Sequence, residues 1–588
     1  MTSLPTKVLV TDAEVASDAE EFTLVYVLNS WGEGDSRHVS LPSLVEEAGD
    51  QVQQAICQWF QLLKAELHTA TGEVLNEDPS LAELHPLFEG NYATTPEHFE
   101  LAQLIMLCRS LNDRVVAELI YRGSSNSIAR CLAVWCKAQN ITFSGPRIHL
   151  SVRRRTHTML SRWRGWLRLI LACQSSVPLD GTKLQSVTTA FVDYLVADPI
   201  DTYWPALRNL TAEHQGRYLF IHQFTRHQAL PTVASARARF DKLQHSGARP
   251  CRALLENAVN VSDLLRIRRA TALLRRVGRF ATTISPPIVP YMAGLQPLDL
   301  YSVQLNRGWH DSTVIDTAMR IVAFNNILSL MPHLRQIIYL QENHRWEKVL
   351  LREATKRQIA TVGIPHTVVR PRDLRYQLIA HDSQSDQFLF PNIIATNGPA
   401  TRDELAAGIA DSRLISIEAQ RYQSLLKIQR VRTGSNRTVL IAGDLLPEHS
   451  QFILDVALPV LQQLNLTVNF KPHPADIGSR LLAEAVGVTI IDGDFQTTLS
   501  RTSLLITGSL TAASAEAVHV GIPVITVVDP SHFNLSPLLR LPFARFARTS
   551  LELRTHLEQL LSQDIKERRE MFTIDDTLLR WRRLLSVE

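Results

Sequence analysis

The alternation of short apolar runs with amphipathic segments, from about residue 299 to the C-terminus, constrains the fold most. Leu300–Leu305, Gln336–Leu340 and Leu504–Thr507 are strand-like runs. Asp311–Leu330 and Ser450–Leu464 have helical periodicity, and the first of these helices has Asp311 or Ser312 available as its cap. Strands and helices that alternate at this spacing form parallel sheets covered by helices. We therefore predict an α/β fold with Rossmann-like, doubly wound domains.

A polar stretch at residues 431–437 interrupts this alternation and predicts a linker between two α/β domains. Residues 299–430 are then expected to complete an N-terminal, acceptor-side domain, and residues 437–588 to form a C-terminal nucleotide-binding domain. Residues 1–40 carry two strand-like runs and are expected to begin the N-terminal domain. Residues 41–298 have mainly helical periodicity and are predicted to be a large helical insertion. A chain of 588 residues is also too long for one ordinary core.

Composition and charge are those of an ordinary globular protein. Hydrophobic residues make up 45% and charged residues 20%, and the formal net charge is only +3. No DNA-reading module or aromatic RNA-binding motif predicts a nucleic-acid partner. The six cysteines form no CxxC pair and no zinc-spaced cluster with histidine, which predicts buried thiols in a reducing compartment. The first residues are unlike a signal peptide, and no apolar run of about 18 residues predicts a membrane span, so we expect a cytoplasmic location.

An unusual motif, Lys471-Pro472-His473-Pro474, directly follows the apolar strand Leu466–Phe470. Two prolines stiffen the strand exit and remove backbone donors, which places the other two side chains where ligands of parallel sheets bind. A cation and an imidazole together stabilise a phosphate oxygen that gains charge as a bond breaks. We assign Lys471 and Pro474 to nucleotide binding and His473 to catalysis. The alternative is a rigid strand exit with an exposed lysine.

A second motif, from Gly508 to Glu516, combines a glycine- and hydroxyl-rich turn with the start of a small-residue helix. The unpaired N–H groups and the positive dipole end of such a helix bind phosphate. Gly508, Ser509 and Thr511 are assigned to the nucleotide phosphate, and Glu516 to a ribose or base. The alternative is an ordinary helix capped by Ser509 or Thr511.

These two motifs, followed by Gly521-Ile522-Pro523, resemble the nucleotide-binding half of GT-B glycosyltransferases. They are most similar to bacterial sialyltransferases and Kdo transferases, in which a His-Pro motif and a serine-rich helix start bind the CMP part of the donor. Polyol-phosphate polymerases of teichoic acid synthesis have similar features. Upstream, Gln341–Glu347, Asn397-Gly398 and Glu418–Tyr422 resemble a family of surface-carbohydrate biosynthesis proteins linked with nonulosonic acids.

The resemblance covers residues 300–540, and the sequence departs from the family pattern at two points. The serines at the turn are not adjacent, because Leu510 separates Ser509 from Thr511. No acidic pair followed by glycine, the motif that supplies the base in those enzymes, is present in the sequence. A nucleotide is therefore a firmer prediction than CMP.

The run Glu342-Asn343-His344-Arg345-Trp346-Glu347 follows the strand Gln336–Leu340 and should lie at the same cleft. An inverting transferase needs a carboxylate to take the proton of the acceptor hydroxyl. Glu342 is the predicted base because it lies just past the strand, and His344 is the alternative base. Trp346 is expected to stack on a sugar, and Glu347 to cap the following helix. The alternative is a cluster that only caps and packs.

Three further positions follow predicted strands. Arg372 is assigned to an anionic sugar or phosphate, and Asn397 to a tight turn at the cleft. Together with His344 and Trp346, these two residues are the predicted acceptor- and sugar-binding residues. Gly443 follows the strand Thr438–Ala442, so its backbone N–H is expected to reach the donor phosphate. A solvated loop is the alternative for Arg372.

A basic amphipathic helix is predicted over residues 152–173. Its apolar face contains Met159, Leu160, Trp163, Trp166, Leu167, Ile170 and Leu171, and arginines flank this face. Such a helix suits the surface of an anionic membrane, where enzymes acting on lipid-linked glycans work. The alternative is a helix packed on its own protein.

The leading hypothesis is an inverting, metal-independent GT-B glycosyltransferase that moves a sugar to a bacterial surface polysaccharide or its lipid-linked precursor. The resemblance implies a nonulosonic donor such as CMP-Kdo or CMP-sialate. No cofactor is expected besides the nucleotide-sugar substrate, and no metal, because the motif lacks the Asp-x-Asp pair that metal-dependent transferases of the other common fold use. The expected partners are the donor, a glycan acceptor and the inner-membrane surface. The alternatives are a CDP-polyol phosphotransferase of the teichoic-acid type and a non-catalytic scaffold in capsule or O-antigen assembly.

Overall fold

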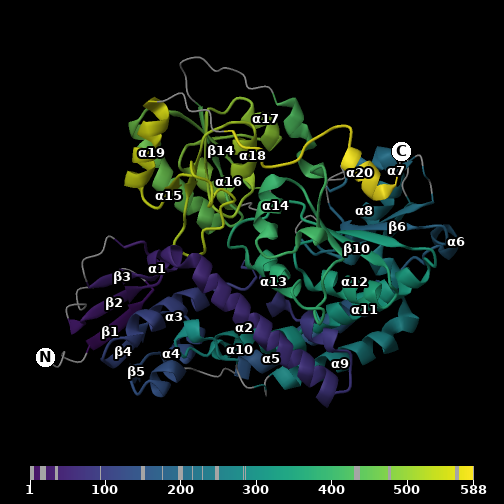
Figure 1. Ribbon diagram of the computed structural model, residues 1–588, viewed down its shortest axis with the longest axis horizontal. Coiled ribbons are helices and arrows are strands. Elements are labelled where there is room, and N and C mark those ends of the chain that lie inside the picture. The colour runs from purple at the N-terminus through teal and green to yellow at the C-terminus, as the bar shows by residue number, and fades with distance from the viewer. Residues whose placement is uncertain are drawn as a thin grey trace.

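The computed structural model of the protein contains three parallel β-sheets flanked by helices (Figure 1). It describes residues 6–12, 21–32, 37–92, 94–146, 152–174, 176–196, 203–212, 214, 216–227, 230–245, 251–281, 284, 287–428, 438–473, 478–562 and 568–586. The predicted α/β class with doubly wound sheets is confirmed. The predicted linker at residues 431–437 lies outside the described residues.

The first sheet has the strand order β3-β2-β1-β4-β5. Its strands are β1 (Thr6–Thr11), β2 (Leu24–Val27), β3 (His38–Ser40), β4 (Val116–Arg122) and β5 (Thr142–Ser144), and its helices are α1 (Leu41–Glu47), α2 (Gly49–Thr69), α3 (Glu97–Asn112) and α4 (Asn126–Ala138). We expected residues 1–40 to share a sheet with the strands after residue 299, and this was wrong. Val8 of β1 pairs with Leu24 of β2 on one edge and with Leu119 of β4 on the other. Because a strand has only two edges, β1 has none left to pair with a strand after residue 299.

The second sheet has the order β12-β11-β10-β9-β6-β7-β8. Its strands are β6 (Thr189–Tyr194), β7 (Tyr218–Gln223), β8 (Cys251–Leu254), β9 (Gln336–Leu340), β10 (Ala360–Ile364), β11 (Ile393–Thr396) and β12 (Leu414–Ser416). Pairing of β6 with β9 joins two distant parts of the chain. Residues 41–298 are thus mainly helical, as predicted, but they also contribute β4 to β8 and are not a purely helical insertion.

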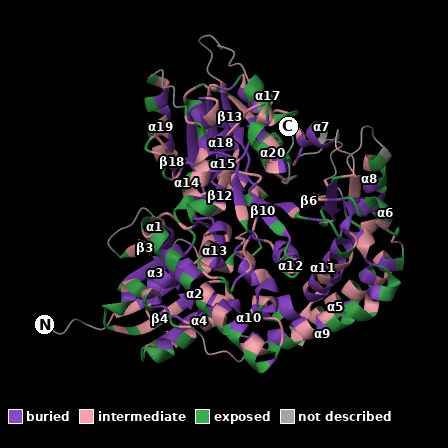
Figure 2. Cartoon of the chain, turned by 45° about the vertical axis from the view of Figure 1, so that its right-hand side comes forward, coloured by how far each residue is buried: buried purple, intermediate pink, exposed green. Residues whose placement is uncertain are grey.

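Helices surround the second sheet and fill the space between it and the first. They are α5 (Val152–Gln174), α6 (Gly181–Leu184), α7 (Leu207–Ala212), α8 (Val233–His245), α9 (Leu264–Ala281), α10 (Pro297–His310), α11 (Ser312–Ser329), α12 (Arg345–Thr355), α13 (Leu374–Asp382) and α14 (Pro399–Ala406). Asp311 caps α11, as predicted, by accepting a hydrogen bond from the Thr313 N–H (2.8 Å). Figure 2 shows that exposed residues concentrate on outer helices such as α5 and α9.

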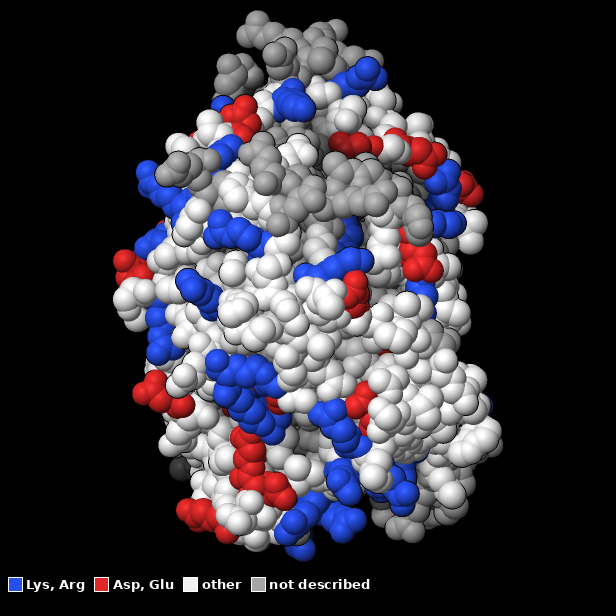
Figure 3. All heavy atoms as spheres, turned by 90° about the vertical axis from the view of Figure 1, so that its right-hand side faces the viewer, with Lys and Arg blue, Asp and Glu red and all other residues white. Residues whose placement is uncertain are grey.

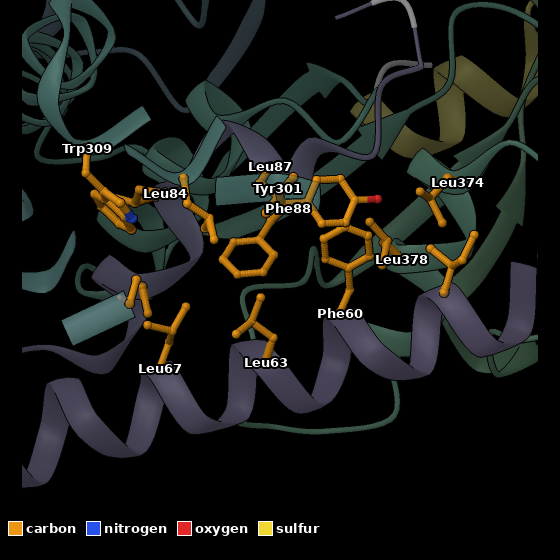
Figure 4. Close-up of a cluster of buried hydrophobic side chains, with 14 of the residues drawn as sticks. Phe60, Leu63, Leu67, Leu84, Leu87, Phe88, Tyr301, Trp309, Leu374 and Leu378 are labelled. Carbon is orange, nitrogen blue, oxygen red and sulfur yellow. The ribbon is translucent and has the colours of Figure 1, made fainter. Parts of the chain in front are cut away.

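The predicted strand Leu300–Leu305 is instead part of α10. Tyr301, Leu305 and Trp309 are all buried, and this four-residue spacing matches a helix rather than a strand. The large core that links the first two sheets explains their burial. In Figure 4, side chains of α2, including Phe60 and Leu63, point toward Tyr301 and its neighbours.

The third sheet has the order β15-β14-β13-β16-β17-β18. Its strands are β13 (Thr438–Ala442), β14 (Thr467–Lys471), β15 (Thr489–Ile490), β16 (Leu504–Thr507), β17 (Val524–Val527) and β18 (Phe546–Ala547); its helices are α15 (Pro447–Gln463), α16 (Gly478–Ala485), α17 (Phe495–Leu499), α18 (Ala513–His519) and α19 (Ser550–Ser562). It lies at the top of Figure 1 with a core of its own. The order changes direction at β13 and β16, which is where such sheets bind ligands.

The C-terminal segment returns from the third sheet to the second. Helix α20 (Leu579–Leu585) places Trp581 edge-on against Trp204, with ring centroids 5.9 Å apart. The buried Glu418 carboxylate accepts hydrogen bonds from the backbone N–H groups of Arg580 (3.0 Å) and Trp581 (3.1 Å). Within the described residues, none of the helices is both long and apolar enough to cross a membrane.

Candidate functional site at the cleft between two sheets

A cleft of about 1620 Å³ lies where the carboxyl ends of the second and third sheets face each other. Glu342 and Arg421 line it from segments that follow β9 and β12, and Gly443, Lys471 and Thr511 line it from segments that follow β13, β14 and β16. This is the edge at which doubly wound sheets bind ligands. The structure thus brings the two predicted halves of the site into one cavity.

Lys471 and His473 both line the cleft, as the strand-exit motif predicts. Lys471 ends β14, and its Nζ donates a hydrogen bond to the carbonyl of Gly493 (2.6 Å). The N–H of Gly443 is bonded to the Lys471 carbonyl (2.9 Å), so it joins the two loops instead of pointing at a ligand. Pro474 lies outside the described residues.

Gly508 lets two loops of the third sheet approach closely. A Cβ atom at this position would overlap the buried carboxylate of Asp444. That carboxylate accepts hydrogen bonds from the N–H groups of Leu445 (2.7 Å) and Leu510 (3.2 Å). Gly508 therefore positions the turn from inside the protein and does not itself line the cleft.

The hydroxyl groups of the turn have different surroundings. Thr511 lines the cleft, and its Oγ1 accepts a hydrogen bond from the Ala513 N–H (3.2 Å), so it caps α18. Ser509 is fully buried and does not line the cleft. The prediction that both hydroxyls face a nucleotide therefore fits Thr511 alone. Helix α18, which follows this turn, has seven residues.

Glu516 is the best candidate for a group that titrates near neutral pH in the cleft. Its side chain is 8% exposed, and its Oε2 accepts a hydrogen bond from Gln496 (3.1 Å). Burial raises the pKa of Glu516 to about 7, although the nearby Arg421 and the bond from Gln496 oppose this rise. Arg421 lies within the run Glu418–Tyr422, and nothing local in the sequence indicates that its charge acts on Glu516.

Glu342 lies on the opposite wall, beside the cationic side chains of Arg375 and His344 and the ring of His366. Its carboxylate is 3.3 Å from Nη1 of Arg375, 3.5 Å from Nε2 of His344 and 3.6 Å from Nδ1 of His366. Burial alone would raise the pKa of Glu342, but these neighbours outweigh burial and hold it well below the ordinary range. Glu342 is therefore ionised at neutral pH.

His344 is held as a charged imidazolium between two carboxylates. Its Nδ1 is 3.2 Å from Glu89, and its Nε2 faces Glu342. Burial would lower the pKa of His344, but the hydrogen bonds to Glu342 and Glu89 raise it to about 10. A charged imidazolium cannot accept a proton, so the electrostatics are against His344 as the alternative base.

Three residues assigned to the acceptor instead have partners inside the protein. Trp346 is buried and donates its indole N–H to the Tyr194 hydroxyl (2.8 Å). Arg372 forms an ion pair with Glu46 (2.8 Å). The Asn397 amide donates hydrogen bonds to the carbonyls of Pro365 (2.9 Å) and Thr367 (2.8 Å). None of these three side chains lines the cleft, because each is already satisfied by tertiary contacts.

Glu347 caps α12, as predicted, because its carboxylate accepts hydrogen bonds from the N–H groups of residues 342, 343 and 344 (2.9, 3.0 and 3.0 Å). This cap fixes the backbone on which Glu342 is placed. On the same wall, Arg370 donates to the Leu510 carbonyl (2.6 Å) and to Asp373 (2.9 Å). The Arg370 bonds couple the acceptor-side wall to the turn of the third sheet.

The second and third sheets are doubly wound and share one cleft, and the C-terminal helix α20 returns from the third sheet to the second. This arrangement defines a GT-B-like α/β protein. Comparison with known proteins adds the following. Neither a protein-family model nor a curated protein matches this chain.

Among solved structures, the chain is similar to a putative UDP-N-acetylglucosamine 2-epimerase from Listeria monocytogenes, with 11% identity, 68% of this chain and 97% of that chain covered, and a TM-score of 0.38. It is also similar to MurG from Acinetobacter baumannii (11% identity, 64% and 91% covered, TM-score 0.36) and to the calicheamicin glycosyltransferase CalG4 (11%, 68% and 94%, TM-score 0.37). At these TM-scores the similarities assign no activity to this chain.

Proposed function

We propose that the protein is a glycosyltransferase that moves a sugar from a nucleotide donor to a glycan acceptor. The observation that carries the proposal is the single cleft in which Lys471, His473 and Thr511 face Glu342 and Arg375 from the opposite sheet. One wall offers cationic and hydroxyl groups for phosphate, and the other offers an ionised carboxylate. Group transfer from a phosphate leaving group needs both.

On the donor side, Lys471 and His473 neutralise the charge that develops on the departing phosphate. Thr511 donates its hydroxyl to the same phosphate, while its Oγ1 still caps α18. Glu516 accepts a hydrogen bond from the ribose or base. Cationic side chains thus supply the stabilisation of the leaving group.

Two carboxylates that line the cleft are candidates for the base, Glu342 on the acceptor side and Glu516 on the donor side, and the pH dependence of kcat/KM distinguishes them. Glu342, ionised throughout the neutral range, is the proposed base, and Arg375 and His344 hold its position. With Glu342 as base, the rate persists well below pH 7, and Glu342→Gln lowers it by about 100-fold or more. A rate that instead falls below about pH 7, together with a loss of this fall in Glu516→Gln, would assign the proton transfer to Glu516.

The proposed donor is a CMP-linked nonulosonic acid, on the basis of the Lys471–Pro474 resemblance. A panel of CMP, CDP, UDP and GDP tests it by thermal shift, because a ligand at 100 times its Kd stabilises the folded protein by about 2.7 kcal/mol. We expect CMP to give the largest shift. A shift with CDP or UDP alone would overturn the CMP assignment, and no shift with any nucleotide would oppose the transferase itself.

A CDP-polyol phosphotransferase is the second enzymatic candidate, since the same cationic wall suits its donor. Hydrolysis assays with CMP-sugars and CDP-polyols separate the two. Under a scaffold role, Glu342→Gln and His473→Ala leave glycan synthesis in cells intact.

We also propose that α5 docks on an anionic membrane, where a lipid-linked acceptor lies. One face of α5 exposes Met159 (73%), Trp163 (66%) and Leu171 (56%) to solvent, whereas Leu169 and Cys173 are buried on the other face. Trp166, predicted to share the apolar face, instead packs on the protein core. An exposed apolar stripe of this size indicates a missing partner.

Charge on and beside α5 favours an anionic lipid surface as that partner. Arg164 and Arg168, which flank the apolar stripe, are exposed as well. Arg162 and Arg279 lie near Arg275 of α9, because their positive charges add to burial in lowering the pKa of Arg275. Lys and Arg side chains gather in the lower part of the face in Figure 3. Positive charges held close together favour binding to the phosphate headgroups of anionic lipids.

Vesicle sedimentation with and without anionic lipid tests the docking. We expect Trp163→Glu to reduce binding about tenfold or more, whereas Leu551→Glu, at an equally exposed apolar residue on α19, leaves it unchanged. Equal binding of both variants, or no binding of the wild type, would overturn the membrane assignment.

A further inference from the structure

His449, Asp529 and His532 form a cluster at the edge of the cleft that the proposed transfer does not use. One ligand atom from each of the three side chains lies within 4.8 Å of the others. His449 lies in the first turn of α15, just after β13, and the other two lie in the loop after β17. Since β13 and β17 flank β16, both segments reach the same sheet edge, and both histidines line the cleft.

The surroundings of His532 leave one ring nitrogen available. Its Nδ1 is 2.8 Å from the carbonyl oxygen of Phe533. A carbonyl only accepts hydrogen bonds, so Nδ1 donates, and in the neutral ring Nε2 then carries the lone pair. His532 is 8% exposed, and this Nε2 is buried with no hydrogen-bond partner in the described part of the chain. An imidazole held by a backbone carbonyl on one nitrogen and bare on the other is the usual state of a metal ligand.

The other two side chains complete the set. Nδ1 of His449 is also buried without a partner among the described residues, and its ring lies 4.5 Å from that of His532, centroid to centroid. Oδ1 of Asp529 accepts hydrogen bonds from the N–H (2.8 Å) and hydroxyl (2.6 Å) of Ser531. Ser531 thus orients the carboxylate, as groups behind a metal ligand do.

We propose that His449, Asp529 and His532 bind one divalent transition-metal ion of the zinc class. Two imidazoles and a carboxylate suit Zn²⁺, and three protein ligands leave a coordination position open. Because both histidines line the cleft, that position faces it and is filled by water or by an oxygen of a bound ligand. The three ligand atoms lie within 4.8 Å of one another, which is close enough for them to be drawn onto one ion.

This site is absent from the sequence-based expectation for a physical reason. Asp529 lies 80 positions after His449 in the sequence, so no short motif contains all three ligands. The lack of an Asp-x-Asp pair in the nucleotide-binding motifs therefore does not exclude a metal whose ligands converge only through the sheet order. The proposal does not depend on sugar transfer.

Metal binding to the full-length protein, stripped with a chelator and dialysed, tests the proposal. We expect Zn²⁺ to bind by calorimetry with one equivalent per chain, and Co²⁺ to develop visible absorption bands. His532→Ala and His449→Ala should each weaken Zn²⁺ binding by more than tenfold, and Ser531→Ala by about tenfold, as removal of a supporting group does. His333→Ala, at an exposed histidine before β9, is the matched control and should bind as the wild type does.

Two results would overturn the site. One is the absence of one-equivalent binding in the wild type. The other is wild-type affinity in a folded His449→Ala or Asp529→Asn variant, which would place the metal elsewhere. If His532→Ala fails to fold, the two variants at the partly exposed residues His449 and Asp529 still decide the matter. Because no donor is present in this assay, its outcome is separate from the outcome of the transferase assays.

Discussion

Replacing Glu516 by glutamine should change how the stability of the protein depends on pH. The free energy of unfolding of the variant, relative to that of the wild type, should increase as the pH rises from acid to alkaline. Burial raises the pKa of the Glu516 carboxyl from its ordinary value of 4.5 to about 7 in the folded protein. Below pH 4.5 both the folded and the unfolded state hold the proton. As the pH rises toward 7, the unfolded state releases the Glu516 proton first, so the free energy of unfolding decreases. Above pH 7 the carboxyl is ionised in both states, and the full cost of burying its charge has been reached. The pKa difference corresponds to about 3 kcal/mol.

The assay is urea unfolding of both proteins at several pH values between 5 and 8. Other buried carboxyls titrate as well, but the difference between wild type and variant isolates Glu516. That difference should change by about 2–3 kcal/mol across the range, with the variant gaining as pH rises. Glu484→Gln, at an exposed residue on α16, is the control and should follow the wild type. Parallel pH profiles for wild type and Glu516→Gln would refute the burial argument.

Three further predictions concern the cleft and its supports. Gly508→Ala should cost about 1–3 kcal/mol of unfolding free energy, because its Cβ displaces the Asp444 carboxylate that holds Leu510; urea unfolding measures this, and an unchanged midpoint would contradict it. Lys471→Ala should abolish the nucleotide-induced thermal shift with little change in stability, since the bond from its Nζ to the Gly493 carbonyl is exposed; a retained shift would remove it from the site. Trp581→Ala should destabilise the packing of α20 by about 3–5 kcal/mol, seen as earlier proteolysis of the C-terminal segment; equal cleavage rates would show that Trp204 does not hold it.

Local features of the fold follow from the sequence. The predicted strands Gln336–Leu340, Thr438–Ala442 and Leu504–Thr507 coincide with β9, β13 and β16. Short apolar runs bounded by polar residues bury themselves in a parallel sheet whatever their neighbours are. The caps at Asp311 and Glu347 were also predictable, because a helix start is satisfied by residues within a few positions.

The candidate site was predictable only in part. Lys471, His473, Thr511, Glu516 and Glu342 reach the cleft because each follows a strand of a parallel sheet, and that order is visible in the sequence. Whether a side chain at such a position is available depends on partners elsewhere in the chain. Arg372, Trp346 and Asn397 are taken by such partners, as the ion pair with Glu46 illustrates.

The sequence by itself determined the class of the sheets, the ends of many strands and the edge at which a ligand would bind. Tertiary structure decided which strands are neighbours, as in the pairing of β6 with β9, and which face of α5 is left to solvent. It also decided the charge state of Glu342 and the convergence of His449 with His532. The reason is that periodicity and capping act over a few residues, whereas pairing, burial and electrostatics depend on atoms brought together from distant parts of the chain.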